Sequence, residues 1–372
     1  MIPIAKPYLT KDEAQAAYDV VLSGWVTQGP KVAEFEEKFS KYTSAENAVA
    51  VSSCTTALHV ALIVAGIKHG DEVICPSMSY IATANSIVYT GATPVFAEVN
   101  EQFNIDPIHA ESLISPKTKA ILIVHQIGMP ADIDAFKDIC KRHKLLLIED
   151  AACAIGSEYK GKKIGSHSEL VCFSFHPRKV ITTGDGGMIT TPNPEYYKRL
   201  KALRQHAMTV NDLERHKSSK IITEEYPEVG YNYRMTDIQA AVGIKQLEKL
   251  DWILQERRKI ALKYNESLES CNHIILPVEK IGYFSNYQSY AVILKDSSPI
   301  KRDALMQAML DKGIATRRGV MTAHNEKAYA KVKTILPTTD LMSNSSIILP
   351  LFVGMSESEQ DFVITNFKQL LQ

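Results

Sequence analysis

Residues 120–150 read AILIVHQIGMPADIDAFKDICKRHKLLLIED, and this stretch decides the fold. Its two apolar runs, AILIVHQ (120–126) and KLLLIED (144–150), predict strands, and the amphipathic segment between them, DIDAFKDICKRH (132–143), predicts a helix. Two strands joined by such a helix form a parallel β-α-β unit. Because both strands are almost continuously apolar, we expect a sheet that is buried on both faces.

The same alternation continues on both sides of this unit. We therefore predict an α/β fold whose large domain, residues 1–250, contains a mostly parallel central sheet. The further predicted strands are AVAVSS (48–53), EVICP (72–76), TPVFAEV (93–99), LVCFSF (170–175) and GMITT (187–191), and the further predicted helices are TTALHVALIVAG (55–66), YIATANSIVYTG (80–91) and residues 106–114.

The pattern changes after residue 233. Residues 235–268 predict one bent helix or two helices, and the tail then mixes a predicted strand (289–295) with a predicted helix (302–313). We expect a smaller α+β domain over residues 251–372. Near the other end of the chain, Thr10 and Glu13 form a capping-box pattern that predicts the start of a helix.

Composition excludes several classes of protein. The 372 residues carry 42 basic and 42 acidic side chains, so no basic excess points to nucleic acid or to an anionic membrane. The longest apolar stretch, about residues 60–67, is far shorter than the ~18 residues that a membrane helix needs. The start of the chain shows no signal-peptide pattern. The six cysteines form no C-x-x-C pair, which argues against a metal site and fits free thiols in a reducing cytoplasm.

Ligands of open parallel sheets bind beyond the carboxyl ends of the strands. Two polar segments lie there: the first could bind an anion, and the second could bind a cationic group. At residues 52–56 (SSCTT), a helix N-terminus can offer N–H groups to a phosphate, or the segment is a plain helix cap. Asp150 follows a buried strand and needs a partner there. That partner is a protonated ring nitrogen, a metal or a cationic side chain, unless Asp150 is only a cap or part of a structural ion pair.

Two further residues at these strand ends suggest a nucleophile and a flat surface. Lys179 precedes the glycine-rich turn 184–187 and is either an amine nucleophile in a low-dielectric cleft or a solvated loop lysine. Tyr80 either stacks on a planar ligand or packs in the core. Pyridoxal phosphate needs four such parts: an anion cradle, an acid for its cationic ring, an amine nucleophile and an aromatic face.

Nearly the whole chain resembles the DegT/DnrJ/EryC1/StrS sugar aminotransferases. The resemblance begins in LSGWVTQGPKVAEFEEKF and runs through VSSCTTALHVAL, PSMSYIATANSI and IEDAACAIGSEYKGKKIG. Its most specific blocks are CFSFHPRKVITTGDGGMI and GYNYRMTDIQAAVGIKQL. It implies an aspartate-aminotransferase-like fold, known as fold type I, and pyridoxal 5'-phosphate as cofactor.

The resemblance also implies roles for single residues. Lys179 would form the Schiff base with the cofactor, Asp150 would pair with the pyridinium nitrogen, and Tyr80 would stack on the ring. The implied phosphate contacts are Thr55, Thr56, Ser174 and, from the neighbouring subunit, Asn232, so a homodimer with shared active sites is expected.

Other positions are less clearly assigned by the resemblance. Cys153 stands where the family commonly has Gln or His near the ring hydroxyl, or it is a plain small core residue. Cys54 stands where the family often has Gly, so its side chain would have to point away from the phosphate. Three residues lie in a predicted loop of the small domain, where the family has residues near the nucleotide-sugar: Arg317, Arg318 and His324. Each of them is equally well interpreted as a solvated loop residue.

The implied reaction moves an amino group from glutamate to a nucleotide-linked keto-sugar by a ping-pong mechanism, in surface-polysaccharide or amino-sugar biosynthesis. The alternatives are a nucleotide-sugar 3-dehydratase on the same fold, a cysteine desulfurase and a non-catalytic regulator. The intact Lys179 and Asp150 argue against a regulator, and no reactive-loop cysteine pattern supports a desulfurase. The dehydratases that resemble this family carry histidine where this chain has Lys179.

Overall fold

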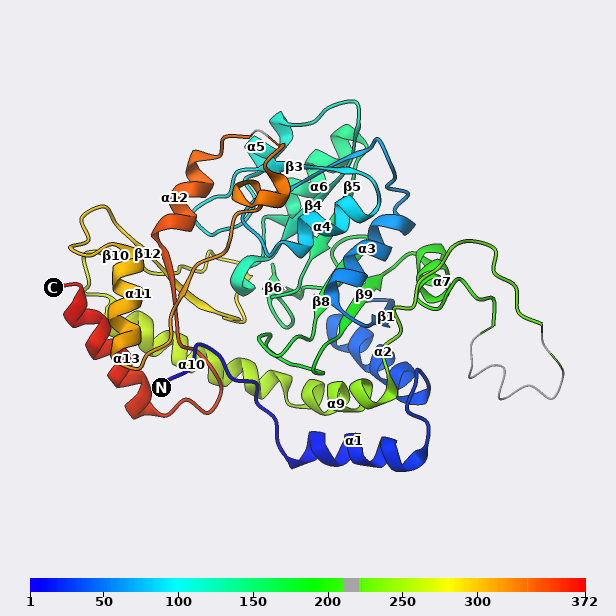
Figure 1. Cartoon of the computed structure of the whole chain (residues 1–372), viewed down its shortest axis with the longest axis horizontal. Helices are drawn as coiled ribbons and strands as arrows, with labels where there is room; N and C mark the ends of the chain where they lie inside the picture. Colours follow the sequence, from blue (N-terminus) through cyan, green and yellow to red (C-terminus); the bar gives the residue numbers. More distant parts are fainter. Residues whose placement is uncertain (211–220, 222, 333) are drawn as a thin grey trace.

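The computed structural model describes residues 1–210, 221, 223–332 and 334–372. A seven-stranded sheet of order β1-β9-β8-β5-β4-β2-β3 forms its centre (Figure 1). Strand β9 runs antiparallel to β1 and β8, whereas β8, β5, β4, β2 and β3 pair in parallel, so the predicted α/β fold is confirmed. The strands are β1 (Asn47–Val51), β2 (Glu72–Pro76), β3 (Thr93–Ala97), β4 (Thr118–Val124), β5 (Leu146–Asp150), β8 (Leu170–Ser174) and β9 (Gly187–Thr191).

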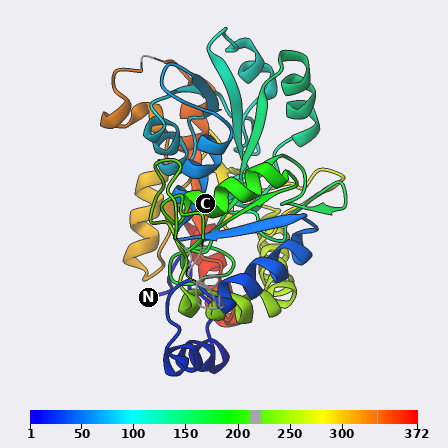
Figure 2. The same cartoon turned by 90° about the vertical axis from the view of Figure 1, so that its right-hand side faces the viewer.

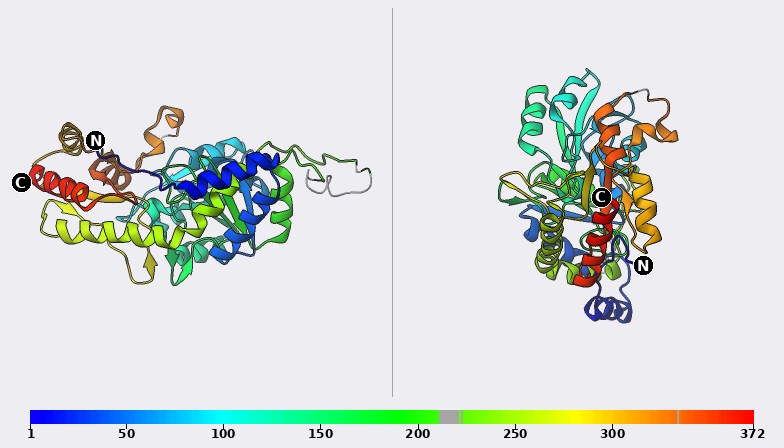
Figure 3. Two further views of the ribbon diagram at one scale, coloured as in Figure 1. Left: turned by 90° about the horizontal axis from the view of Figure 1, so that it is seen from below. Right: turned by 90° about the vertical axis from the view of Figure 1, so that its left-hand side faces the viewer.

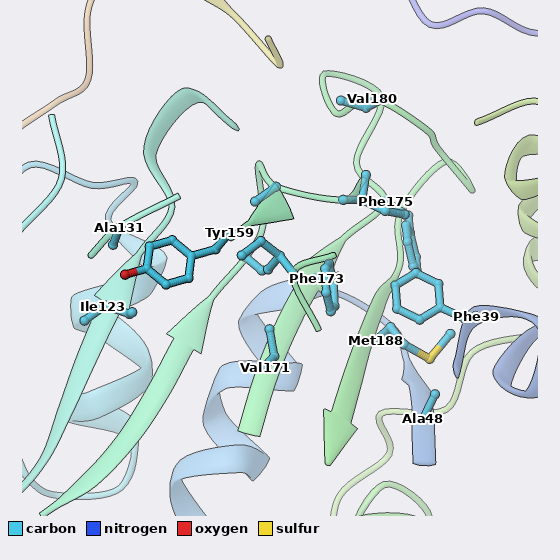
Figure 4. Packing of buried hydrophobic residues seen from close by; sticks show 14 of the residues in the cluster. Phe39, Ala48, Ile123, Ala131, Tyr159, Val171, Phe173, Phe175, Val180 and Met188 are labelled. Carbon is cyan, nitrogen blue, oxygen red and sulfur yellow. The ribbon is translucent and has the colours of Figure 1, made fainter. Parts of the chain in front are cut away.

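Helices cover both faces of this sheet, as the apolar strands predict. The alternation of side chains along β1 places Ala48 and Ala50 in one core and Val49 and Val51 in the other. In the first core, Phe39 packs edge-on against Phe173 and Phe175, with ring centroids 5.0 and 5.7 Å away (Figure 4). The first core is closed by α2 (Pro30–Thr43), α6 (Ile133–His143) and α9 (Asp237–Glu248), and the second by α3 (Cys54–Val64), α4 (Ala82–Tyr89) and α7 (Pro194–Leu203).

The long helical segment divides at Lys249 into α9 and α10 (Leu250–Leu268). The first turns of α10 belong to the core of the large sheet, whereas Ala261, Tyr264 and Leu268 belong to the core of the C-terminal lobe. Because α10 serves both cores, the division of the chain at residue 250 stays a prediction. The lobe contains the sheet β10-β12-β14-β13 with β10 (Ile274–Ile275), β12 (Tyr290–Leu294), β13 (Arg317–Arg318) and β14 (Ser346–Leu349), and the helices α11 (Arg302–Asp311) and α13 (Glu357–Leu370).

Both ends of the chain lie at the C-terminal lobe (Figure 3). Ile2 forms a bridge with Ile314, so the first residues pair with the lobe before the chain crosses to α1 (Lys11–Ser23). Helix α1 begins with the predicted Thr10–Glu13 capping box and is the lowest element in Figures 1 and 2. Among the described helices, none combines the length and the apolar character needed to cross a membrane.

Short elements complete the described part of the chain. They are α5 (Pro107–Ser112), α12 (Pro337–Ser345), the 3₁₀ turns η1 (Gln126–Gly128), η2 (Ala323–Asn325) and η3 (Lys327–Tyr329), and the small sheet β11-β6-β7 of β6 (Glu158–Tyr159), β7 (Lys162–Lys163) and β11 (Tyr283–Phe284).

Candidate active site

Lys179 lies in the turn that follows β8, with its side chain directed at the loop after β5. Its Nζ atom is 3.2 Å from the Sγ atom of Cys153. Burial lowers the pKa of the Lys179 amine, but the Cys153 sulfur and the Asp150 carboxylate raise it, and the net result is a pKa above the ordinary value. Lys179 is therefore not a free surface lysine.

Asp150 ends β5 and is only 4% exposed. Its Oδ2 atom accepts a hydrogen bond from Thr83 Oγ1 at 2.8 Å, and its Oδ1 atom accepts one from the Ala152 N–H at 3.1 Å. Burial raises the pKa of this carboxyl, while the two donors and the Lys179 amine oppose that effect. A cation placed beside Asp150 would favour the charged carboxylate in the same way.

Residues 52–56 lead into α3 and cap its N-terminus, and their role as an anion cradle stays a prediction. Ser53 and Thr56 make a reciprocal capping box, so the Thr56 hydroxyl already has partners in its own turn. The N–H groups of Cys54 and Thr55 point out of the first turn, where no helical acceptor exists. The backbone of Gly187 packs so closely that an added Cβ would lie 2.4 Å from the Ser53 carbonyl oxygen.

Cys54 is half-buried and packs against the second core of the sheet. Burial raises the pKa of its thiol, and Asp150 and Lys179 both lie near enough to influence that pKa. These influences place the thiol in the neighbourhood of the two charged groups. That the thiol points away from a phosphate stays a prediction.

Tyr80 and Ser174 occupy opposite environments. Tyr80, in the loop between β2 and α4, is 71% exposed and is not a core residue. Ser174 ends β8, is 7% exposed, and its Oγ atom accepts the His176 N–H at 3.4 Å. The aromatic face of Tyr80 is thus open to a ligand, whereas Ser174 lies at the base of the turn that carries Lys179.

Asn232 lies on the surface of this chain, in the segment that runs along the α3 N-terminus. The neighbouring Tyr233 carbonyl accepts the Ser52 N–H at 2.8 Å, which ties the two segments together. The Asn232 side chain is exposed, so a contact with the neighbouring subunit stays a prediction.

The three predicted substrate residues are not equivalent. Arg317 and Arg318 are exposed and form β13, an edge strand, rather than the predicted loop. Burial lowers the pKa of Arg317, and the nearby charges of Arg178 and Arg318 add to that effect. This accumulation of positive charge beside the Lys179 turn would attract an anion.

His324, by contrast, is packed into the protein. Its Nδ1 atom is 2.6 Å from Ser77 Oγ, its Nε2 atom is 3.3 Å from Asp340 Oδ1, and its side chain is 4% exposed. His324 therefore anchors the segment that leads to Tyr80 and does not face an open surface.

Several residues that sequence reasoning missed hold this site together. Thr83 and Ser79 lie within the quoted block PSMSYIATAN, where two small hydroxyls around an aromatic were the available signal. Asn286 has no such signal, because it comes from the C-terminal part of the chain. Its fully buried amide donates to the Cys153 and Ile155 carbonyls, each at 2.8 Å.

His125 lies beneath the site and was also missed. It accepts the Ala131 N–H at Nδ1 and therefore carries its proton on Nε2, 2.8 Å from the Glu149 carboxylate. In the described part of the chain, no group of three or more His, Cys, Asp or Glu side chains is placed to hold a metal ion.

These residues fit pyridoxal phosphate. The Asp150 carboxylate and the Lys179 amine both influence the pKa of Cys54, the first residue of α3. This carboxylate, this amine and the α3 N-terminus suit the ring nitrogen, the aldehyde and the phosphate of that cofactor. The fold and the site thus define an enzyme of the fold-type I aminotransferase class.

Residues 7–368 match the model of the DegT/DnrJ/EryC1/StrS aminotransferase family, and the chain belongs to this family. It is a pyridoxal-phosphate-dependent transaminase.

Solved structures of similar proteins agree with this assignment. Spr1654 from Streptococcus pneumoniae, described as a sugar aminotransferase in its PMP form, is 29% identical, with a TM-score of 0.94 over 100% of this chain and 99% of its own. Helicobacter pylori PseC, an aminotransferase of pseudoaminic acid biosynthesis, is 26% identical, with a TM-score of 0.93 over 100% and 99%. DesV from S. venezuelae, in complex with a ketimine intermediate, is 32% identical, with a TM-score of 0.90 over 100% and 98%.

Proposed function

We propose that this enzyme transfers the amino group of glutamate to a nucleotide-linked keto-sugar and so makes an amino-sugar for surface polysaccharide or a related product. The observation that carries the proposal is the lysine at position 179, whose amine lies 3.2 Å from the sulfur of Cys153, in the loop that follows the buried Asp150. The similarity to PseC and DesV supports a sugar as the amino acceptor. We further propose that the enzyme is a cytoplasmic homodimer in which Asn232 completes the partner's site.

The residues of this chain divide the work between binding and proton transfer. When bound, pyridoxal phosphate supplies an electron sink for the carbon that loses its proton. Asp150 would hold the positive charge of the ring nitrogen, the α3 N-terminus with Thr55 and Thr56 would hold the phosphate, and Tyr80 would offer its aromatic face to the ring. Lys179 Nζ would take the proton from the α-carbon of glutamate as a general base, and as a general acid it would later donate a proton to the sugar carbon that gains the nitrogen.

We assign binding of the nucleotide-linked sugar to the residues whose charge suits its phosphates. Arg317 and Arg318 are exposed beside the Lys179 turn, and guanidinium groups suit the oxygens of a diphosphate. His324 is proposed to support this region by anchoring the chain near Ser77, since its own side chain is buried.

The test is a reaction with ¹⁵N-glutamate and a panel of nucleotide-linked keto-sugars. We expect the label to appear on the sugar and one 2-oxoglutarate to form for each sugar aminated. Borohydride reduction of the loaded enzyme should fix the cofactor to Lys179, and the Lys179→Ala variant should show neither attachment nor turnover. A deoxygenated sugar without the label would instead identify a 3-dehydratase.

A further inference from the structure

Two buried hydroxyl groups form a chain that ends on Asp150. Thr83 Oγ1 is 2.8 Å from Asp150 Oδ2, and Ser79 Oγ is 2.7 Å from Thr83 Oγ1. Thr83 is 1% exposed and Ser79 is 3% exposed, so neither hydroxyl can replace its protein partner with bulk water. The contacts are therefore a fixed part of the site.

The direction of this chain follows from the number of protons. Each hydroxyl has one proton to donate, and an ionised carboxylate only accepts. Thr83 therefore donates to Asp150, and Ser79 donates to Thr83. The other oxygen of Asp150, Oδ1, accepts the Ala152 N–H. Because both carboxylate oxygens of Asp150 are hydrogen-bonded, the orientation of the carboxylate plane is fixed.

The same segment also holds the aromatic residue of the site. The Thr83 N–H donates to the Tyr80 carbonyl at 3.1 Å, and the Ser79 N–H donates to the Ser77 carbonyl at 3.1 Å. The Thr83 side chain lies in the first turn of α4, yet it bonds to Asp150 and not to its own helix end. The acid and the aromatic face are thus set by one short stretch of chain.

We propose that Thr83, supported by Ser79, is a positioning residue that keeps Asp150 ionised and correctly oriented for the ring nitrogen of pyridoxal phosphate. The inference rests on the proposed function, because it takes Asp150 to be the partner of the ring. Thr83 acts through Asp150 and has no contact of its own with the reacting atoms.

The first test compares Thr83→Val with Thr83→Ser. Valine has the shape of threonine but no hydroxyl, so Asp150 loses a donor and Ser79 loses its acceptor. We expect the Kd for pyridoxal phosphate, from absorbance titration of the apoenzyme, to rise about tenfold or more in Thr83→Val and to stay near the native value in Thr83→Ser. The matched control is Ser86→Ala, which removes a buried α4 hydroxyl that bonds only to the Thr83 carbonyl and should leave the Kd unchanged.

The second readout is the pH dependence of cofactor binding. Binding needs the ionised form of Asp150, so it persists above the pKa of that group and is lost below it. Removal of a donor raises this pKa, so binding in Thr83→Val should fail at a higher pH than in the native enzyme. The other groups that face Asp150 are unchanged in both proteins: Lys179, His125, Cys54 and Cys172. A purely structural role would lower the melting temperature without moving this pH profile.

The outcomes separate the inference from the proposed function. Native affinity and a native pH profile in Thr83→Val would overturn the role of Thr83, provided that Asp150→Asn binds the cofactor weakly. Native affinity in Asp150→Asn would overturn the proposed pairing itself. Should Thr83→Val not fold, Thr83→Ala serves in its place, and Ser79→Ala should give a smaller loss of the same kind.

Discussion

The amine of Lys179 lies 3.2 Å from the sulfur of Cys153, and the two side chains come from different loops of the large sheet. The Cys153 backbone is held in turn by the buried amide of Asn286, which lies in the chain between β11 and β12. The sulfur contributes to the raised pKa of Lys179. Cys153 is therefore one of the groups that favour the protonated form of Lys179.

We expect Cys153→Ala to lower the pKa of Lys179. Only the unprotonated amine attacks the cofactor aldehyde, so covalent attachment below that pKa should become faster. The rate of attachment to the apoenzyme is measured by absorbance over a range of pH, and we expect the pH profile of this rate to move to lower pH in the variant. The conservative Cys153→Ser variant keeps a polar partner and should shift less. The control is Cys271→Ala, in the C-terminal lobe, which should leave the pH profile of attachment unchanged. A pH profile for Cys153→Ala that coincides with the native one would refute the effect.

Local patterns in the sequence predict the elements of this protein well and the contacts between them poorly. The run EVICP coincides with β2, because a buried strand is encoded in adjacent residues. Arg317–Arg318 was expected in a loop, since a two-residue edge strand is too short to show any periodicity. The bonds from Thr83 to Asp150 and from His324 to Ser77 join residues far apart in the chain, and no spacing rule predicts them. The sequence therefore offers candidates for the chemistry, whereas the contacts that orient these candidates appear only in the folded chain.

A shared active site predicts complementation between inactive subunits. Lys179→Ala and Asn232→Asp chains should each be inactive alone, because each lacks one part of every site. In a mixed dimer one site receives both native residues, so equal mixing should restore about a quarter of the native activity. Activity is measured after subunit exchange has been verified by native mass spectrometry. An absence of recovery in verified heterodimers would show that Asn232 acts within its own chain.

The contact between α1 and the α9–α10 junction predicts a pH-dependent contribution to stability. Burial raises the pKa of Glu13, but hydrogen bonds from Gln246 and Lys249, together with those from the Thr10 cap, lower it to about 2. A lowered pKa stabilises the fold above the unfolded-state value of about 4.3, and this stabilisation is lost as the pH falls toward 2.

Glu13→Gln should therefore unfold more easily than the native protein at neutral pH, by about 2 kcal/mol. The difference should shrink as the pH falls from about 5 to 3. Urea unfolding followed by circular dichroism at several pH values measures it. The control is Glu37→Gln, which removes an exposed partner of Lys41 and should cost little at any pH. A constant difference for Glu13→Gln across this range would contradict the assignment.

The close packing of Gly187 against the α3 N-terminus predicts a defect that is specific for the phosphate. A Cβ at Gly187 would lie 2.4 Å from the Ser53 carbonyl oxygen and 2.8 Å from the Cys54 nitrogen, so Gly187→Ala must displace the first turn of α3. Overpacking of this kind costs about 1–3 kcal/mol, and here it also misaligns the N–H groups proposed to hold the phosphate.

We therefore expect Gly187→Ala to bind pyridoxal phosphate about tenfold more weakly or worse, while its affinity for pyridoxal, which has no phosphate, changes little. The ratio of the two dissociation constants is the measurement. Gly184→Ala is the control, because φ is +86° at this position and would strain an alanine, but a Cβ there meets nothing within 4 Å. That variant should lose stability and keep the native ratio, since Gly184 does not pack against α3. Equal losses of affinity for both ligands in Gly187→Ala would contradict the assignment of the phosphate to the α3 N-terminus.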